Sequence, residues 1–244
     1  MDGEDDAVLR VAVLYPDLLG TYGDGGNAAV LATRAHVRDI DLEVHEVTIG
    51  SSIPPAELYL LGGGEDGPQR LACDLLTEGG FIDRFSEGAH VFAVCAGLQI
   101  LGTSFSIEGD ASYPGLGLVE ATTTRGATRS VGDLATMVRG RMLVGFENHG
   151  GVTVLGEGVE AYGDVVVGRG NNGRVDGFRA PRLIATYAHG PVLAQNPWLA
   201  DELLSEISGQ ELAPWPSVAD RLYAERRALL STRRSDVDRT GDRR

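Results

Sequence analysis

With 244 residues, 43% of them hydrophobic, the chain can bury the core of one sizeable α/β domain, or of one domain with a small appendage. The net charge of −14, from 35 acidic and 21 basic residues, argues against nucleic acid or an anionic membrane as the main partner. No apolar run approaches the roughly 20 residues that span a bilayer, and the acidic N-terminus lacks the layout of a signal peptide.

The first half of the chain alternates between short apolar strands and helices. Asn27 is a suitable N-cap for the first of these helices. Such alternation is typical of a parallel sheet covered by helices on both faces, so we expect an α/β fold with a mostly parallel central sheet. Strands are expected over residues 8–14, 42–49 and 57–61 and in the segment that leads into Cys95, and helices over residues 28–37 and about 69–85.

The second half has a different character. Residues 104–187 read mostly as short strands and glycine turns, including Asn172-Gly173, a strong hairpin signal. A strand over residues 183–188 follows, and then helices over residues 197–207 and 217–230. The charged segment 231–244 lacks apolar periodicity, so we expect a disordered tail.

The strongest candidate for catalysis is Cys95. An apolar strand leads into it, the small residues Ala96 and Gly97 follow, and an apolar helix begins there, which is the pattern of a nucleophile on a sharp turn between strand and helix. The helix N-terminus is expected to lower the pKa of the thiol. The alternative is a plain buried cysteine in a core strand.

The second cysteine, Cys73, lies in an amphipathic segment and is expected in the core. Together with Cys95 it forms neither a disulfide framework nor a metal-ligand spacing. We therefore expect reduced thiols, no metal site and a cytoplasmic protein.

A cysteine nucleophile needs a base, and the chain offers five histidines. His189 directly follows an apolar strand, and sites in open parallel sheets form beyond the carboxyl ends of the strands. Position favours it over its competitor His149. The remaining histidines, which are expected at the surface or at the wrong end of a strand, are His36, His45 and His90.

The glycine loop at residues 62–64 also follows a strand. Because the chain contains no lysine, a phosphate-binding loop of the usual kind is excluded. Glycines let backbone amides approach a ligand closely, so this loop can donate to an oxyanion. A flexible turn explains the glycines equally well.

Five segments together resemble class I glutamine amidotransferases of the cobyric acid synthase-like branch, in particular the glutaminase subunit of lipid II isoglutaminyl synthase. The resemblance covers about residues 8–208 and implies the flavodoxin-like fold of class I amidotransferases. Residues 209–230 would then form a helical extension before the tail at 231–244. The segments that carry the resemblance are residues 15–27, 61–66, 93–99, 145–151 and 187–191.

The resemblance implies a division of catalytic roles. Cys95 would attack the side-chain carboxamide of glutamine, and His189 would protonate the leaving ammonia and then activate water. The amides of Ala96 and of Gly63 or Gly64 would stabilise the oxyanion of the tetrahedral adduct.

Substrate binding is assigned in the same way. By resemblance Arg129 clamps the α-carboxylate of glutamine, with Arg125 as the second choice, since the guanidinium fork matches a carboxylate. Gln99, one helical turn past the nucleophile, is placed to contact the substrate, although polarity of a helix surface explains it as well.

One departure concerns the residue two positions after His189. Most class I amidotransferases place a glutamate there to orient the imidazole, whereas this chain has Pro191, a lack that the cobyric acid synthase-like branch shares. We hypothesise that a partner supplies or organises the missing carboxylate. Asp24 and Asn27 could line the site or meet the partner, but turn formation and helix capping explain them adequately. His149 and Glu147 are assigned to structure or to the interface.

The resemblance also implies a partner. Ammonia would pass to a Mur-ligase-like subunit that uses ATP and Mg²⁺ to amidate D-glutamate of lipid II to D-isoglutamine in peptidoglycan synthesis, and this chain would need no cofactor. It contains no recognisable nucleotide motif. Two alternatives stay open: an amidotransferase for another acceptor, as in cobyrinate amidation, and a non-catalytic scaffolding subunit. Retention of Cys95 and His189 argues against the latter.

Overall fold

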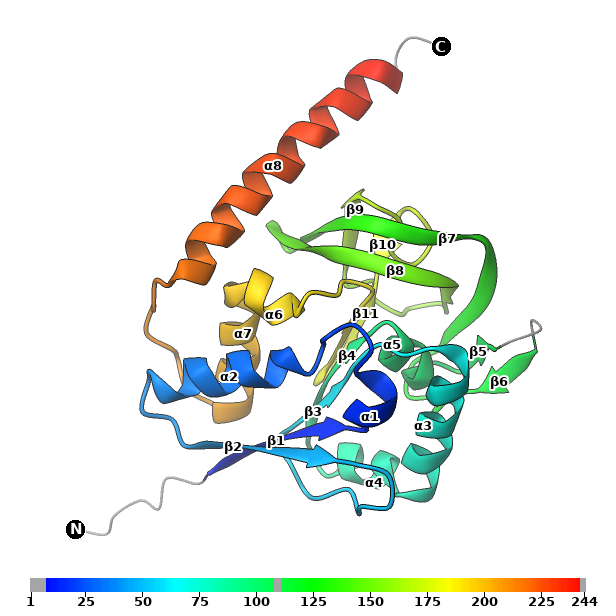
Figure 1. Cartoon of the computed structure of the whole chain (residues 1–244), viewed down its shortest axis with the longest axis vertical. Coiled ribbons are helices and arrows are strands. Elements are labelled where there is room, and N and C mark those ends of the chain that lie inside the picture. The colour runs from blue at the N-terminus through cyan, green and yellow to red at the C-terminus, as the bar shows by residue number, and fades with distance from the viewer. Residues whose placement is uncertain (1–7, 108–110, 242–244) are drawn as a thin grey trace.

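The structure is a computed structural model that describes residues 8–107 and 111–241 (Figure 1). Its first sheet has six strands, and all neighbours in it are parallel except the last pair, which is antiparallel. The parallel strands follow the flavodoxin-like order. In spatial order the strands are β2 (Leu42–Val47), β1 (Leu9–Leu14), β3 (Leu58–Leu61), β4 (His90–Val94), β12 (Leu183–Thr186) and β11 (Phe178–Ala180).

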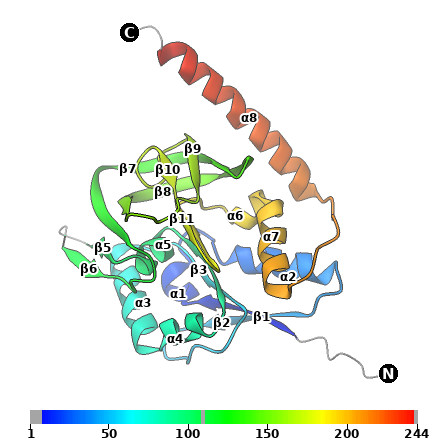
Figure 2. The same ribbon diagram turned by 180° about the vertical axis from the view of Figure 1, so that it is seen from behind.

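Helices cover both faces of this sheet (Figures 1 and 2). α2, α6 and α7 pack together on one face, and α3 and α4 pack together on the other. The interior strands are buried on both sides, which explains why they read as continuous apolar runs. The helices are α1 (Pro16–Leu19), α2 (Gly26–His36), α3 (Asp66–Glu78), α4 (Phe81–Ser86), α5 (Ala96–Leu101), α6 (Val192–Gln195), α7 (Pro197–Ser208) and α8 (Val218–Gly241).

Two local predictions for the first half are wrong in detail. The helix expected over residues 69–85 is two helices, because the pair Gly79-Gly80 ends α3 and Gly80 adopts a left-handed φ of 70°. Asn27 lies inside α2, whose N-cap is Gly25. Its side-chain oxygen accepts a hydrogen bond from the Leu193 amide at 3.0 Å, so it joins α2 to α6 instead of capping.

The second sheet is mostly antiparallel and lies beside the carboxyl edge of the first. The hairpin expected at Asn172-Gly173 forms between β9 and β10. The longest strands, β7 and β8, are longer than the short strands expected and are interrupted by a register shift between Arg125 and Ser130. The strands are β5 (Ser104–Ser106), β6 (Ser112–Pro114), β7 (Ala121–Val138), β8 (Arg141–Leu155), β9 (Gly163–Val167) and β10 (Val175–Asp176).

β8 pairs with β7 along one edge, and three different segments bind its other edge between Met142 and Phe146. The Met142 carbonyl accepts from the Tyr223 hydroxyl at 2.8 Å. The Asn196 side chain binds both the amide and the carbonyl of Val144, at 2.8 and 2.7 Å. Phe146 exchanges two backbone hydrogen bonds with His189, at 2.8 and 3.2 Å.

The C-terminal helix differs from the prediction. α8 continues to Gly241, through most of the segment expected as a disordered tail, and residues 242–244 lie outside the described residues. Leu230 is fully buried against Ala135, Met142 and Val144, which fixes α8 to the second sheet before the helix projects away from it (Figure 2). Among the described residues, no helix combines the length and apolar character needed to cross a membrane.

Candidate active site

The parallel sheet brings four distant segments to one edge. Because β1, β3, β4 and β12 are parallel, the residues that follow their carboxyl ends meet there. Those residues are Asp24, Gly63, Cys95 and His189.

Cys95 stands between β4 and α5 in a strained conformation. Its φ of 51° and ψ of −103° lie in a region that residues with a Cβ rarely adopt. Its amide donates to the Thr186 carbonyl at 2.9 Å, which ties the turn to β12. A Cβ at Gly97 would lie 2.6 Å from Cβ of Leu61, so the small residue is required by close packing. These features agree with the predicted nucleophile turn.

Burial dominates the electrostatics of the Cys95 thiol. Desolvation raises its pKa to about 12, and the negative charge of Asp24 acts in the same direction. The Ala96 amide and the Arg129 charge lower the pKa, but by less. The helix N-terminus lowers this pKa as expected, through the amide of Ala96 at the start of α5, but the cost of desolvating a thiolate is larger, so the pKa is raised overall.

His189 has an orienting carboxylate within this chain. Its Nδ1 lies 3.0 Å from Oδ2 of Asp24, and both side chains are almost completely buried. A carboxylate at Nδ1 holds the tautomer whose Nε2 can act as a base. The sequence-based expectation that such a group is missing from the chain is wrong. Nε2 has no hydrogen-bond partner among the described residues, so it is not bonded to the Cys95 thiol in this state.

The His189 ring is also fixed by packing. It stacks on Phe146 with ring centroids 5.4 Å apart and lies against Tyr22 at 4.6 Å. A Cβ at Gly63 would lie 2.5 Å from Cε1 of the ring, so a glycine is needed for this approach. The imidazole therefore has little freedom to rotate.

The two candidate oxyanion glycines differ in position. The Gly63 amide donates to Oδ2 of Asp24 at 2.9 Å and is engaged by that carboxylate. Gly64 and Ala96 instead line the pocket that contains Cys95. The geometry therefore favours Gly64 over Gly63 as the second donor.

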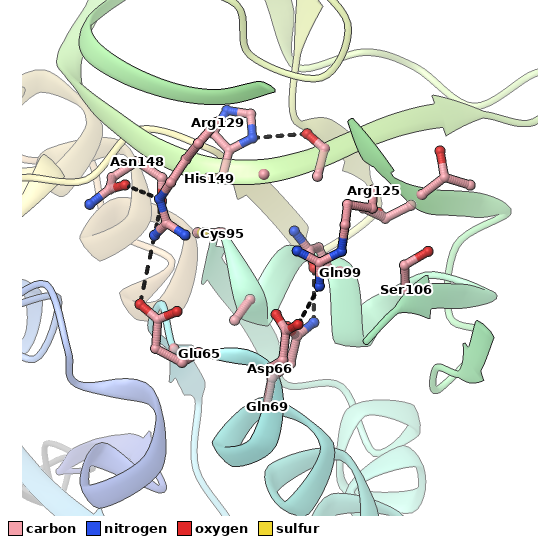
Figure 3. Close-up of a pocket in the computed structure, with 16 residues that line it drawn as sticks. Glu65, Asp66, Gln69, Cys95, Gln99, Ser106, Arg125, Arg129, Asn148 and His149 are labelled. Carbon is pink, nitrogen blue, oxygen red and sulfur yellow. Dashed lines mark hydrogen bonds and ion pairs between the residues drawn. The ribbon is translucent and has the colours of Figure 1, made fainter. Parts of the chain in front are cut away.

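The pocket beside Cys95 is polar and open on one side (Figure 3). It collects side chains from the loop before α3, from α5, and from β7 and β8. It contains Gln99 and both candidate clamp arginines, whereas His189 lies outside its lining. The residues that line it are Gly64, Glu65, Asp66, Gln69, Cys95, Ala96, Gln99, Ser106, Thr123, Thr124, Arg125, Arg129, Asn148, His149, Gly150 and Gly151.

Arg129 reaches this pocket from the irregular part of β7, where the register shift turns the chain. Its Nε donates to Oδ1 of Asn148 at 2.6 Å, and its Nη2 donates to the Tyr22 hydroxyl at 2.8 Å. Nη2 also lies 3.6 Å from Oε1 of Glu65. Arg125 forms an ion pair with Asp66.

A sequence model of the CobB/CobQ-like glutamine amidotransferase domain matches residues 10–197. The chain belongs to this family. This confirms the predicted enzyme class, a glutamine amidotransferase, and agrees with the strained Cys95 and the His189–Asp24 pair at the carboxyl edge of the sheet.

Curated relatives narrow the comparison. The amidotransferase is 32% identical over 214 residues to the lipid II isoglutaminyl synthase (glutamine-hydrolyzing) subunit GatD of Staphylococcus aureus strain N315, which covers 85% of this chain and 87% of the relative. It is 31% identical to the subunit of the same name from Streptococcus pneumoniae, over 99% of this chain and 96% of the relative. A cobyric acid synthase from Pelotomaculum thermopropionicum is 28% identical, but the match covers only 38% of that protein.

Solved structures support the predicted fold. A crystal structure of a glutamine amidotransferase superposes with a TM-score of 0.52 at 24% identity and covers 82% of this chain and 99% of that one. The PurLQS structure from Thermotoga maritima superposes with a TM-score of 0.58 at 16% identity, and the match covers 82% of this chain and 97% of that chain. At these identities the likeness concerns the fold alone, and it confirms the expected amidotransferase architecture.

Gln99 occupies an internal position in the amidotransferase. Its Oε1 accepts from Gln69 at 2.9 Å, and its Nε2 donates to the Tyr187 hydroxyl at 3.1 Å. Tyr187 in turn lies 2.7 Å from the Thr153 hydroxyl. Surface polarity does not explain Gln99, because it is part of a buried network under the pocket. Its contact with substrate stays a prediction.

His149, the competing base, has a different environment. Its Nδ1 lies 2.9 Å from the Gly151 carbonyl, and its Nε2 lies 3.3 Å from Oε2 of Glu147. The ring stacks on Tyr187 at 3.9 Å. Both ring nitrogens are in contact with protein groups within β8, and the assignment of His149 and Glu147 to structure or to an interface stays a prediction.

Proposed function

We propose that this amidotransferase is the glutaminase subunit of a lipid II isoglutaminyl synthase. It hydrolyses glutamine to glutamate and ammonia, and the ammonia passes to a Mur-ligase-like subunit that amidates D-glutamate of lipid II to D-isoglutamine. The proposal is supported by two relatives of this name that match most of the chain. ATP and Mg²⁺ belong to the partner's reaction, and the cytoplasm, where thiols such as Cys73 and Cys95 stay reduced, is the proposed compartment.

The observation that carries the hydrolytic step is the buried His189–Asp24 pair. His189 follows β12, which pairs directly with β4, the strand that leads into the strained Cys95. Because the thiol is protonated at neutral pH, His189 Nε2 takes its proton as Sγ attacks the carboxamide carbon of glutamine. The imidazolium that forms is stabilised by the Asp24 carboxylate at Nδ1. The oxyanion of the tetrahedral adduct accepts from the amides of Ala96 and Gly64.

The second half of the reaction reverses the proton transfer. His189 gives its proton to the leaving nitrogen, the C–N bond breaks, and ammonia departs from a thioester on Cys95. His189 then takes a proton from water, which attacks the thioester carbonyl. The C–S bond breaks, His189 returns the proton to Sγ, and glutamate leaves the regenerated thiol. Throughout, Arg129 holds the α-carboxylate of the substrate.

The test is the release of glutamate from glutamine by the wild type and by Cys95→Ala, each alone and with the Mur-ligase-like subunit. We expect activity only with the intact thiol, and D-isoglutamine formation from lipid II only when both subunits are present with ATP. A Cys95→Ala variant as active as the wild type would contradict the hydrolytic role. A complex that hydrolyses glutamine but amidates a cobyrinate acceptor in place of lipid II would contradict the proposed acceptor.

A further inference from the structure

Two arginines and two acidic residues face one another across the pocket. Arg125 and Arg129 come from β7, Glu65 is the N-cap of α3, and Asp66 is the first residue of that helix (Figure 3). Arg125 pairs with Asp66, and Arg129 lies beside Glu65. The pocket therefore presents both signs of charge a short distance from the nucleophile.

Glu65 is held next to Arg129 by a third residue. The Tyr22 hydroxyl donates to Oε1 of Glu65 at 2.7 Å and accepts from Nη2 of Arg129 at 2.8 Å. The same Tyr22 ring packs against His189. Glu65 is thus positioned by a side chain that also touches the catalytic histidine, although its own carboxylate is half-exposed in the pocket.

The Glu65–Arg129 pair acts on the reacting thiol. Arg129 lowers the pKa of Cys95 and Glu65 raises it, whereas Arg125 and Asp66 are not among the main charges that shift this pKa. Within the four charges, Glu65 and Arg129 are therefore the pair with the stronger electrostatic effect on Cys95.

We propose that Glu65 binds the α-ammonium group of the substrate and selects glutamine with a free α-amino group over acylated or peptide-bound glutamine. The inference rests on the proposed function, because it takes Arg129 as the clamp of the α-carboxylate. The two charges of glutamine are carried on the same carbon atom, and Nη2 of Arg129 lies 3.6 Å from Oε1 of Glu65. A carboxylate on the Arg129 fork therefore places the ammonium beside Glu65, where a charge-assisted hydrogen bond forms.

The neighbouring acid provides a matched control. Asp66 has the same charge and lines the same pocket, but it is paired with Arg125 and sits in the first turn of α3, where a carboxylate stabilises the helix N-terminus. Asp66→Asn and Glu65→Gln each remove one negative charge from adjacent positions. Only the second removes the group assigned to the α-ammonium.

The experiment compares L-glutamine with glutarate monoamide, which has the same carboxylate and carboxamide but no α-amino group. Calorimetry on the full chain with Cys95→Ala measures binding without turnover. Adding Glu65→Gln should weaken glutamine binding about 10- to 100-fold and change glutarate monoamide binding by less than about twofold. Adding Asp66→Asn should change both affinities by the same factor.

Several outcomes would overturn the inference. An equal loss of affinity for both ligands in Glu65→Gln would mean that Glu65 has a structural role only. A loss of affinity for glutamine alone in Asp66→Asn would assign the α-ammonium to Asp66. If glutamine did not bind at all, the proposed site would be wrong. Failure of the proposed function is distinguishable. Glutamine would then bind with the expected selectivity, but the wild type would release no glutamate.

Discussion

The two sides of the pocket are built in different ways. At the sheet edge, Cys95, His189 and Asp24 are buried, His189 is hydrogen-bonded to Asp24, and the amides of Cys95 and His189 donate to backbone carbonyls. Across the pocket, the side chains of Arg129 and Glu65 are 48% and 55% exposed and interact through solvent-accessible charges. The buried side fixes the geometry of bond making, whereas the exposed side recognises a charged, mobile ligand.

This difference predicts two kinds of sensitivity. Buried charge-assisted hydrogen bonds are costly to break, and salt screens them weakly. Interactions between exposed charges are screened by salt more strongly. Changes at the buried sheet edge should therefore affect kcat, and changes on the exposed side should affect KM and its dependence on salt.

The largest effect is expected for Asp24→Asn. Loss of the carboxylate leaves Nδ1 of His189 without its acceptor and allows the wrong tautomer, so kcat for glutamine hydrolysis should fall roughly 10²- to 10⁴-fold with little change in KM. Steady-state assays of glutamate release measure this. Asp17→Asn, an exposed acid of α1, is the control and should stay near wild type. An Asp24→Asn variant with wild-type kcat would mean that Asp24 does not orient the His189 imidazole and that a partner supplies this carboxylate.

A smaller loss is expected for Gly63→Ala. The new methyl group would lie 2.5 Å from Cε1 of His189 and must push the ring out of position, so kcat should fall about 10- to 100-fold. Gly67→Ala is the matched control from the same region, because a Cβ there meets nothing within 4 Å and the residue lies in α3. That control should keep full activity and gain up to about 1 kcal/mol of stability in thermal unfolding.

The exposed side is tested by Arg129→Ala. Removal of the fork should raise the KM for glutamine about 10- to 100-fold and change kcat much less, because the reacting groups stay in place. Arg125→Ala should raise KM less, since its charge is paired with Asp66. In the wild type, sodium chloride at high concentration should raise KM and leave kcat nearly constant. A larger KM effect from Arg125→Ala would exchange the two assignments.

The smallest effect concerns thiol reactivity in the ligand-free chain. With a Cys95 pKa of about 12, the thiolate fraction increases about tenfold for each pH unit between pH 7 and 9, so alkylation by iodoacetamide in a Cys73→Ala background should rise without a plateau. Asp24→Asn removes a charge that raises this pKa and should speed alkylation several-fold at fixed pH, while it slows turnover. A plateau near pH 7 would indicate a preformed thiolate.

The sequence was sufficient to predict the local features of the site. The small residues around Cys95 indicated the sharp turn, and the apolar run before His189 indicated the end of a parallel strand. Both predictions concern segments whose pattern is contained within a few neighbouring residues. The parallel sheet then brings the segments together, as alternation of strand and helix had indicated.

The missed features depend on contacts between distant segments. Asp24 is 165 positions from His189, and its loop reads equally well as a turn, so no spacing connects the two residues. The raised pKa of Cys95 depends on how deeply the finished fold buries the thiol. Leu230 is buried against strands more than 80 positions earlier, which a charged C-terminal composition does not indicate.

The protected edge of β8 limits how another chain can associate there. An unpaired strand edge is a template for strand addition and for aggregation, because its amides and carbonyls still need partners. Here the Met142 carbonyl binds Tyr223, and both the amide and the carbonyl of Val144 and of Phe146 bind Asn196 and His189, respectively. A protein that approaches these residues meets side chains in place of free backbone, so it must recognise them by shape and chemistry rather than by extending the sheet.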